Sequence, residues 1–505
     1  MPEASFPAVE MRGIVKQFPG VLANDHVDLT VRAGEIHALL GENGAGKTTL
    51  MNILYGIYHP DEGEIFVKGR RVHIRSPRDA IRLGIGMVHQ QFRLVPSHTV
   101  LENVVLGLPG NFFFPERAAR PRLEEFARRY GLHVDPDARI WQLSAGEQQR
   151  VEIIKALYRG ADILILDEPT SMLTPREIEE LMHTVRRMAD DGNTVIFITH
   201  KLDEVFAVSD RVTVLRQGQV VATLESARTD KRELARLMVG RDVLFRLEKR
   251  PVALGPAVLE AQDLHIRSDR GLPAVRGVSF SIAAGEILGV AGVAGNGQRE
   301  LVEALAGLRP VEKGRVFLNG EDVTNRPPRP LVRRGVCYVP GERLVGTVPN
   351  LSVAENLILK TYDQAPVCRG IFLDSQVISS HADALIERYA VATPSRETPL
   401  KLLSGGNIQR AILARETSSK PSLLIVAHPT SGLDIGATEY IRQVLLSQRE
   451  EGTAILLVSE DLEEILQLSD RIAVMYNGEM MGILPTDRAD METIGMMMAG
   501  VHRNS

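Results

Sequence analysis

Short apolar runs alternate with amphipathic stretches along both halves of the chain. Positions 35–40, 163–166 and 194–199 are runs of this kind, rich in Val, Ile and Leu and about the length of one strand. This alternation is typical of helices packed on a mainly parallel sheet. We therefore expect an α/β fold whose functional residues lie at the ends of strands.

The same motifs occur twice, about 250 residues apart. The recurring segments are AGEI at 33–36 and 284–287, LSAG and LSGG at 143–146 and 403–406, and SDRV and SDRI at 209–212 and 469–472. The two copies of a motif are further apart for the later motifs than for the earlier ones, which indicates an insertion near positions 362–375 in the second half. A period this long indicates a duplicated domain rather than a solenoid. We expect two domains, residues 1–245 and 246–505, with a linker within positions 242–257, where Pro and Gly interrupt the periodicity.

The first of the apolar runs leads directly into a glycine-rich loop. Residues 41–48 read GENGAGKT, which matches the pattern G-x-x-x-x-G-K-[ST], and a helical stretch over 49–55 follows. Glycines let successive backbone N–H groups turn toward phosphate oxygens, and the dipole of the following helix favours negative charge. Lys47 would reach the β- and γ-phosphates, and Thr48 a magnesium ion. The residues predicted to bind nucleotide here are Gly41, Asn43, Gly44, Ala45, Gly46, Lys47, Thr48 and Thr49.

Two adjacent carboxylates, Asp167 and Glu168, end the apolar run at 163–166. Side chains alternate along a strand, so the two are expected to have different roles. Asp167 suits magnesium, bound directly or through water, and Glu168 suits polarisation of the attacking water. A strand that ends in Asp-Glu is more often only the start of a turn. The phosphate loop earlier in the chain favours the catalytic interpretation.

Two Ser-Gly-rich segments carry a resemblance to a known family. SAGEQQR at 144–150 and SGGNIQR at 404–410 resemble the signature motif of ATP-binding cassette (ABC) ATPases. Each precedes a predicted helix, over 147–158 and 408–417, so backbone N–H groups can face an anion. In that family the anion is the γ-phosphate of ATP held by the opposite domain. Either segment by itself would more often be an ordinary helix cap.

The resemblance assigns roles to further residues. Gln90 matches the glutamine loop that senses magnesium and the transport partner, and His200 matches the switch histidine that contacts the γ-phosphate. Phe18 could stack on adenine, although an aromatic residue there suits a core equally well. The resemblance therefore implies ATP and Mg²⁺ as ligands. The catalytic residues that it implies are Lys47, Gln90, Glu168 and His200, and the metal-binding residues are Thr48, Gln90 and Asp167.

The second half departs from the family pattern at its chemical positions. Its loop keeps the glycines but has Gln298 in place of the lysine and Arg299 in place of the hydroxyl residue. Both carboxylates are replaced, and Glu460 in place of the switch histidine would repel a γ-phosphate. We infer that this half cannot hydrolyse ATP by the family mechanism. The degenerate positions are Gly292, Gly295, Gly297, Gln298, Arg299, Gly341 (for Gln90), Ala427, His428 and Glu460.

Head-to-tail pairing, as in the family, would sort these residues into two composite sites. The first would combine the intact residues of the first half with Ser404, Gly405, Gly406 and Asp434 of the second. The other would combine the degenerate positions with Ser144, Gly146 and positions 171–174, where Thr174 replaces an aspartate. We predict one hydrolytic site and one structural or nucleotide-retaining site. The halves could pair within one chain or between two copies.

Composition narrows the classes of partner. The 505 residues include 59 Lys+Arg and 64 Asp+Glu, a net charge of −5, so no global basic field favours nucleic acid. Two cysteines are too few for a disulfide framework, and the start of the sequence has no secretory pattern, which together favour a reducing cytoplasm. No stretch reaches 18 apolar residues, so a role at a membrane would require partner chains.

Fused cassettes with a degenerate second half resemble the ATP-binding subunits of bacterial importers for simple sugars and nucleosides. Segments 87–96 and 146–158 are more similar to the nucleoside branch. The resemblance implies two integral-membrane permease subunits, an extracytoplasmic substrate-binding protein, and a peripheral location on the cytoplasmic face of the inner membrane. Segments 92–103 and 343–356 would receive the permeases.

Three alternatives to a nucleoside importer subunit stay open. The first is an importer ATPase for a simple sugar of the ribose or galactose type. The second is a soluble twin-cassette factor acting on ribosomes, which the short linker and the altered second site disfavour. The third is a non-hydrolytic nucleotide sensor, which the intact Glu168 disfavours.

Overall fold

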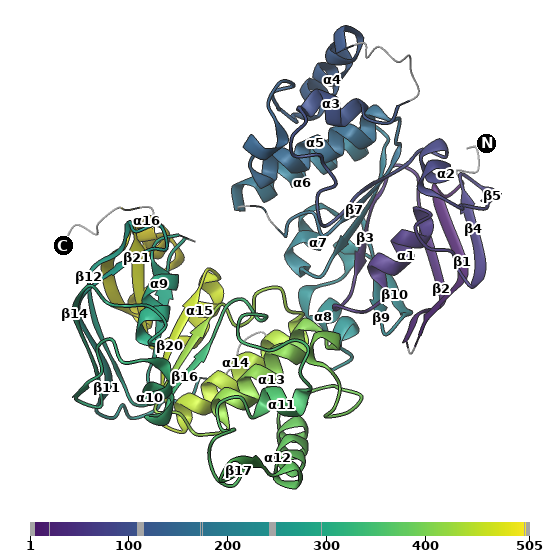
Figure 1. The fold of residues 1–505 in the computed structure, drawn as a ribbon. Helices are drawn as coiled ribbons and strands as arrows, with labels where there is room; N and C mark the ends of the chain where they lie inside the picture. Colours follow the sequence, from purple (N-terminus) through teal and green to yellow (C-terminus); the bar gives the residue numbers. More distant parts are fainter. Residues whose placement is uncertain are drawn as a thin grey trace. The chain divides into compact units, whose positions relative to one another are not determined.

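The computed structural model describes residues 6–19, 21–108, 116–171, 173, 175–241, 249–293, 295–498 and 500. The chain divides into two compact units, Met1–Val243 (unit 1) and Leu244–Ser505 (unit 2), each considered by itself (Figure 1). The predicted domain boundary between positions 245 and 246 lies outside the described residues. So do Met172 and Thr174 of the predicted second site and Ala294 of the second loop.

The elements of unit 1 follow the predicted alternation of strands and helices. In chain order they are β1 (Val9–Phe18), β2 (Val21–Val31), β3 (Ile36–Leu40), α1 (Lys47–Leu54), β4 (Glu62–Val67), β5 (Arg70–Val72), α2 (Pro77–Arg82), β6 (Ile85–Val88), α3 (Val100–Val105), α4 (Glu116–Tyr130), α5 (Ala145–Tyr158), β7 (Ile163–Asp167), α6 (Pro175–Asp190), β8 (Thr194–Thr199), α7 (Leu202–Val208), β9 (Arg211–Arg216), β10 (Gln219–Glu225) and α8 (Lys231–Val239). Short 3-10 turns occupy Ile140–Gln142 and Ser226–Arg228.

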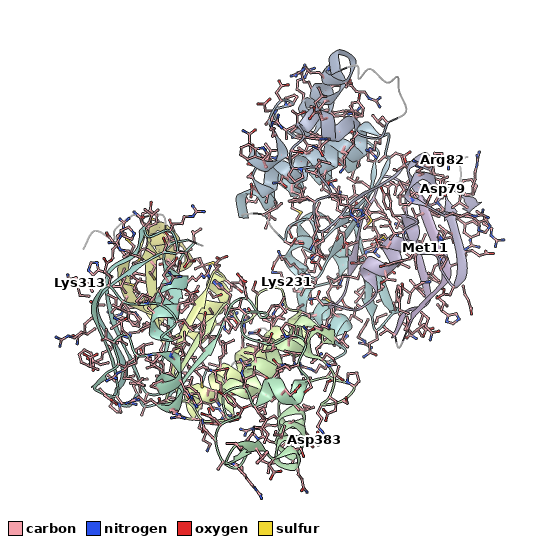
Figure 2. The ribbon with its side chains drawn as sticks, viewed as in Figure 1. Met11, Asp79, Arg82, Lys231, Lys313 and Asp383 are labelled. Atoms are coloured by element: carbon pink, nitrogen blue, oxygen red, sulfur yellow. The ribbon has the colours of Figure 1, made fainter. Side chains whose placement is uncertain are left out.

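Unit 1 is built on two sheets. The antiparallel sheet has the order β2-β1-β4-β5, and a six-stranded sheet has the order β10-β9-β3-β8-β7-β6. All neighbours in the six-stranded sheet are parallel except β9 and β10. β3, β7 and β8 are buried along their whole length, as expected for parallel strands covered on both faces. Met11 lies in the core that the two sheets share, whereas Arg82 lies at the surface and pairs with Asp79 at 2.5 Å (Figure 2).

The elements of unit 2 repeat this sequence of strands and helices. In chain order they are β11 (Ala257–Arg267), β12 (Pro273–Ala283), β13 (Ile287–Ala291), α9 (Gln298–Leu305), β14 (Lys313–Leu318), β15 (Glu321–Asp322), α10 (Pro328–Arg333), β16 (Val336–Val339), α11 (Val353–Leu357), β17 (Cys368–Arg369), β18 (Phe372–Leu373), α12 (Ser375–Arg388), α13 (Gly405–Thr417), β19 (Leu423–Ala427), α14 (Ile435–Glu450), β20 (Ala454–Ser459), α15 (Leu462–Leu468), β21 (Arg471–Tyr476), β22 (Glu479–Pro485) and α16 (Met491–Met498). Short 3-10 turns occupy Leu400–Leu402 and Thr486–Arg488.

The sheets of unit 2 have the same topology as those of unit 1. An antiparallel sheet of order β12-β11-β14-β15 accompanies a six-stranded sheet of order β16-β19-β20-β13-β21-β22. Only β21 and β22 are antiparallel neighbours in the second sheet. A separate hairpin of β17 and β18 lies within the insertion that the sequence predicted near 362–375. The predicted α/β fold with mainly parallel sheets is thus confirmed.

Each unit has a group of helices around its signature segment: α3 and α4 pack on α5, and α11 and α12 pack on α13 (Figure 1). Both α5 and α13 begin two or three residues earlier than predicted because a serine caps each of them. Ser144 Oγ accepts a hydrogen bond from the Glu147 backbone N–H at 3.3 Å, and Ser404 Oγ accepts one from the Asn407 N–H at 3.4 Å. The signature segments are therefore helix starts, as the sequence predicted.

The predicted linker becomes part of unit 2 from Lys249 onward. Lys249 Nζ lies 3.0 Å from Asp470 Oδ1, and Arg449 Nη1 donates to the Arg250 carbonyl at 2.8 Å. Arg449 in turn holds Asp470 through two hydrogen bonds of 2.8 Å. These contacts fix the start of the described part of unit 2 against α14.

None of the helices within the described ranges combines the length and apolar composition that crossing a lipid bilayer requires.

Candidate functional site

The phosphate loop of unit 1 joins β3 to α1, as predicted. Gly44 and Gly46 have φ values of 82° and 98°, in the region that favours glycine. A Cβ on Gly46 would lie 2.3 Å from the backbone oxygen of Ala23, so no other residue fits there without a backbone shift. α1 begins at Lys47, two residues earlier than predicted, so the loop ends at the first turn of a helix.

Lys47 is folded back onto its own loop. Its side chain is buried, and Nζ donates to the carbonyl oxygens of Gly41 at 2.8 Å and Glu42 at 2.9 Å. Ala45 is buried as well, whereas Asn43 and Gly44 are exposed. The loop thus holds an ammonium group among its own carbonyls, close to the backbone that the motif uses for phosphate.

Asp167, the last residue of β7, contacts this loop. Its Oδ1 accepts a hydrogen bond from Thr48 Oγ1 at 3.3 Å. Burial, and secondarily the charge of Glu168, raise the pKa of Asp167 to about 6. A hydroxyl and a carboxylate fit magnesium, which typically takes one or two carboxylates together with substrate phosphates. No cluster of three or more His, Cys, Asp or Glu suited to a metal occurs among the described residues.

Glu168 lies between Gln90 and His200. Gln90 Nε2 donates to Oε2 of Glu168 at 2.9 Å, and His200 Nδ1 lies 3.1 Å from Oε1. The hydrogen bond with His200 lowers the pKa of Glu168, so the carboxylate is ionised and can accept a proton. Its φ of 46° is unusual for a residue with a side chain and is a conformation that clusters at functional sites. Three motifs that lie far apart in the sequence therefore meet at one carboxylate.

Phe18 lies on β1 and is half-buried. Its ring meets that of Tyr58 edge-on, with centroids 5.3 Å apart, and Lys16 Nζ lies 5.7 Å from its centroid. The ring is thus not in the core, and its contact with adenine stays a prediction. Thr49 is half-buried in the first turn of α1.

The corresponding loop of unit 2 has nearly the same backbone but different side chains. Gly295 and Gly297 have φ values of 87° and 96°, and a Cβ on Gly297 would lie 2.2 Å from the Ala274 carbonyl oxygen. Gln298 is buried like Lys47, and its Nε2 donates to the Val293 carbonyl at 3.2 Å. Arg299 is exposed and donates to Glu303 at 2.8 Å. This loop keeps the shape of a phosphate loop without its lysine or hydroxyl.

A cavity of about 390 Å³ in unit 2 brings the degenerate positions together. His428 has a φ of 45°, nearly that of Glu168, although it carries an imidazole where unit 1 has a carboxylate. Arg299 and Ala427 stand where unit 1 has Thr48 and Asp167, so neither oxygen that fits magnesium is present. The predicted positions that line the cavity are Gln298, Arg299, Gly341, Ala427, His428 and Glu460.

Two stretches of the chain, residues 24–171 and 275–431, match the family described as ABC transporter. They contain both phosphate loops, both signature segments, and the strands β7 and β19, which end at Asp167 and Ala427. The chain belongs to the ABC transporter family. The ATP-binding domains of this family bind and hydrolyse ATP, so the protein is an ATPase.

Curated ABC relatives match nearly the whole chain. The nucleoside import ATP-binding protein of Lactococcus lactis subsp. cremoris is 48% identical over 99% of this chain and 100% of its own length. The guanosine import ATP-binding protein of Bacillus subtilis is 47% identical over 97% of each chain. The glucose import ATP-binding protein of Haloferax volcanii is 47% identical over 98% of this chain and 96% of its own. A solved archaeal ribosome recycling factor, in complex with a ribosomal stalk protein, has a TM-score of 0.62 at 19% identity over 97% of this chain and 92% of that chain, a likeness of fold alone.

The ABC signature segments have neighbours that sequence reasoning missed. Arg343 lies against Gly405 in unit 2, and Glu177 lies against Gly146 in unit 1. Asp434, predicted to act across the two halves, caps α14 by accepting a hydrogen bond from the Ala437 N–H at 2.7 Å. Arg343 is the first residue of the segment 343–356, and neither it nor Glu177 belongs to a signature motif, so only the tertiary structure relates them to the signature.

Proposed function

We propose that this chain is the ATP-hydrolysing, energy-coupling subunit of an ABC importer for nucleosides. The observation that carries the hydrolytic role is Glu168, ionised and held between Gln90 and His200 beside the Thr48–Asp167 pair. The nucleoside and guanosine import relatives, 48% and 47% identical, support the cargo. The glucose import relative at 47% identity keeps a simple-sugar importer as the second candidate.

The proposed hydrolytic site assigns one task to each group of residues. The loop residues Gly41, Asn43, Gly44, Ala45, Gly46 and Thr49 would hold the phosphates, and Lys47 would neutralise the β- and γ-phosphates. Glu168, oriented by His200, would accept a proton from a water molecule while the oxygen of that water attacks the γ-phosphorus. The bond between the γ-phosphorus and the β–γ bridging oxygen would break, which yields ADP and phosphate. Magnesium held by Thr48, Asp167 and Gln90 would neutralise phosphate charge. Phe18 would stack on adenine.

The signature that completes this site would come from the second half. Ser404, Gly405 and Gly406 would face the γ-phosphate, and Asp434 would approach from the start of α14. The domains are then residues 1–245, with intact motifs, and 246–505, with degenerate ones. The second composite site, which Ser144 and Gly146 would complete, is proposed to be structural or nucleotide-retaining. The pairing is either within one chain or between two copies.

The partners that this function requires are two integral-membrane permeases and an extracytoplasmic substrate-binding protein, with no nucleic acid. The chain would lie peripherally on the cytoplasmic face of the inner membrane. Segments 92–103 and 343–356 would receive the permeases. An apolar cavity of about 370 Å³ along the second segment supports this role, since exposed Leu308, Val345 and Val348 line it.

ATP would couple to transport through its affinity for a closed arrangement of the two cassettes. A ligand shifts a conformational equilibrium only by its differential affinity for the two states. ATP bound between a phosphate loop and the opposite signature would favour the closed state, and loss of the γ-phosphate would remove that preference. Hydrolysis at the first site would therefore reopen the cassettes.

The test of this function is ATP turnover by the chain reconstituted with its permeases and binding protein. We expect a binding protein loaded with a nucleoside to stimulate turnover, and one loaded with ribose or glucose to leave it at the basal rate. Stimulation by sugars alone would replace the nucleoside with the second candidate. Co-purification with ribosomes instead of membrane permeases would overturn the importer function altogether.

A further inference from the structure

The two signature segments are packed against side chains of opposite charge. In unit 2, a Cβ on Gly405 would lie 2.8 Å from Nη1 of Arg343, so the guanidinium covers this glycine. Nη2 of the same arginine donates to the carbonyl of Ser431, which is the first residue of the stretch SGLD at 431–434 that contains Asp434. Arg343 therefore bridges two segments that the proposed function assigns to the hydrolytic site.

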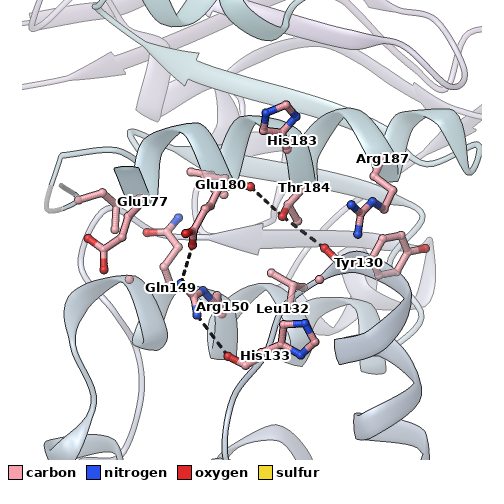
Figure 3. Close-up of a pocket in the computed structure, with 14 residues that line it drawn as sticks. Tyr130, Leu132, His133, Gln149, Arg150, Glu177, Glu180, His183, Thr184 and Arg187 are labelled. Atoms are coloured by element: carbon pink, nitrogen blue, oxygen red, sulfur yellow. Dashed lines mark hydrogen bonds and ion pairs between the residues drawn. The ribbon is translucent and has the colours of Figure 1, made fainter. Parts of the chain in front are cut away.

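Unit 1 has an acidic group beside Gly146, the signature glycine that corresponds to Gly406 rather than to Gly405. A Cβ on Gly146 would lie 2.2 Å from Oε1 of Glu177, in the first turn of α6. Figure 3 shows Glu177 pointing from α6 toward α5, beside Gln149, in a pocket of about 530 Å³. The counterpart of Glu177 in unit 2 is Ala437, whose Cβ lies 3.3 Å from the position of a Cβ on Gly406. Unit 2 thus lacks this carboxylate, and its arginine lies by the adjacent signature glycine, Gly405.

Within the described part of unit 2, the environment of Arg343 leaves its charge uncompensated. No carboxylate forms an ion pair with it among the described residues, and the side chain is half-buried, which lowers the pKa of the guanidinium. A guanidinium has five N–H donors in a planar fork, a geometry that suits carboxylate or phosphate oxygens. An incoming anion forms its strongest hydrogen bonds with a partly desolvated cation that has no acidic partner.

We propose that Arg343 contacts the γ-phosphate of the ATP hydrolysed at the first site, beside Ser404, Gly405 and Gly406. The inference rests on the proposed composite site, in which this signature faces the phosphate loop of the first half. Arg343 adds a positive charge where negative charge spreads over the γ-phosphoryl oxygens in the transition state. Glu177 gives the signature of unit 1 the opposite charge. The charges of the two signature segments therefore favour a γ-phosphate at one site only.

The first test is ATP turnover by the full chain with its permeases. We expect Arg343→Ala to lower kcat by about 100- to 1,000-fold, the range for loss of one donor that stabilises transition-state charge. Arg343→Lys should recover part of the loss, since it keeps the charge but not the fork. In both variants, the affinity for ADP and the melting temperature should not change. Arg315→Ala, which removes an exposed arginine of β14, is the matched control and should retain wild-type turnover.

A second measurement separates contact with the γ-phosphate from a purely structural bond to Ser431. ATP and its γ-fluoro analogue, which has one negative charge fewer on the terminal phosphate, are compared as competitive ligands. The wild type should bind ATP more tightly than the analogue. The ratio of these two affinities should shrink at least about fivefold in Arg343→Ala, because removal of the γ-phosphate charge costs little once the arginine that contacts it is gone. An unchanged ratio in a folded variant would overturn the inference.

Lys47→Ala in the same assays separates the inference from the function on which it rests. If Lys47→Ala abolishes turnover while Arg343→Ala turns over at the wild-type rate, only the role of Arg343 is wrong. If Lys47→Ala turns over normally, the assignment of the hydrolytic site is wrong, and the role of Arg343 fails with it.

Discussion

The two phosphate loops have nearly the same backbone and different chemistry. Gly46 and Gly297 differ by 2° in φ, and in both loops a Cβ would meet a carbonyl of the neighbouring β2 or β12. Lys47 and Gln298 are both buried and both donate to carbonyls of their own loop. The backbone is thus fixed by packing against the adjacent strand. The two loops differ in the chemistry of their side chains, which can change while the fold is retained.

The carboxylate position separates the two units most strongly. We expect Glu168→Gln to lower ATP turnover by about 100- to 10,000-fold, because an amide cannot accept the proton of the attacking water. His428→Gln, the matched variant in unit 2, should change turnover by less than about threefold. Steady-state phosphate release by both variants measures this. Equal losses would mean that both units take part in the chemical step.

A buried ion pair in unit 2 has an exposed counterpart in unit 1. Arg449 and Asp470 are 4% and 16% exposed, whereas Arg186 and Asp210 are 42% and 39% exposed. We expect Arg449→Met to lower the free energy of unfolding by roughly 3 kcal/mol, because Asp470 loses a desolvated partner. Arg186→Met should cost less than about 1 kcal/mol. Urea unfolding followed separately for each unit measures both values.

The same ion pair predicts a dependence on pH. Burial raises the pKa of Asp470, but the hydrogen bonds from Arg449, the Ile287 backbone N–H and Lys249 together lower it below its ordinary value of 3.8. The pair therefore stabilises the fold fully above that value and is lost as the pH falls through the folded pKa. The difference in stability between wild type and Arg449→Met should shrink below about pH 4. A constant difference down to pH 2 would contradict the assignment.

The shared backbone of the loops predicts equal responses to a change that affects geometry alone. Gly46→Ala and Gly297→Ala should each destabilise their own unit by about 2 kcal/mol, since alanine is strained at positive φ and its Cβ would meet a backbone oxygen. For units of about 250 residues this lowers the melting temperature by about 4–8 °C. A large loss in one unit only would mean that the loops are not equivalent.

The sequence predicted most of the fold and much of the site because both follow local patterns. The strand, loop and helix around Lys47 and the buried run before Asp167 can be identified without coordinates. Helix starts were predicted two or three residues late at α5 and α13, where capping serines extend the helices. The neighbours Arg343 and Glu177 could not be predicted, because they reach the signature glycines through tertiary packing. The fit of Gln90 and His200 around Glu168 likewise requires three strands in register.

The claim that one site hydrolyses ATP is tested most directly by a matched pair of variants at the loop. ATP turnover of the full chain with its permeases is measured for Lys47→Ala and Gln298→Ala under saturating ATP. We predict a loss of at least about 100-fold for Lys47→Ala and less than about threefold for Gln298→Ala. Equal losses, or a greater loss for Gln298→Ala, would contradict the account.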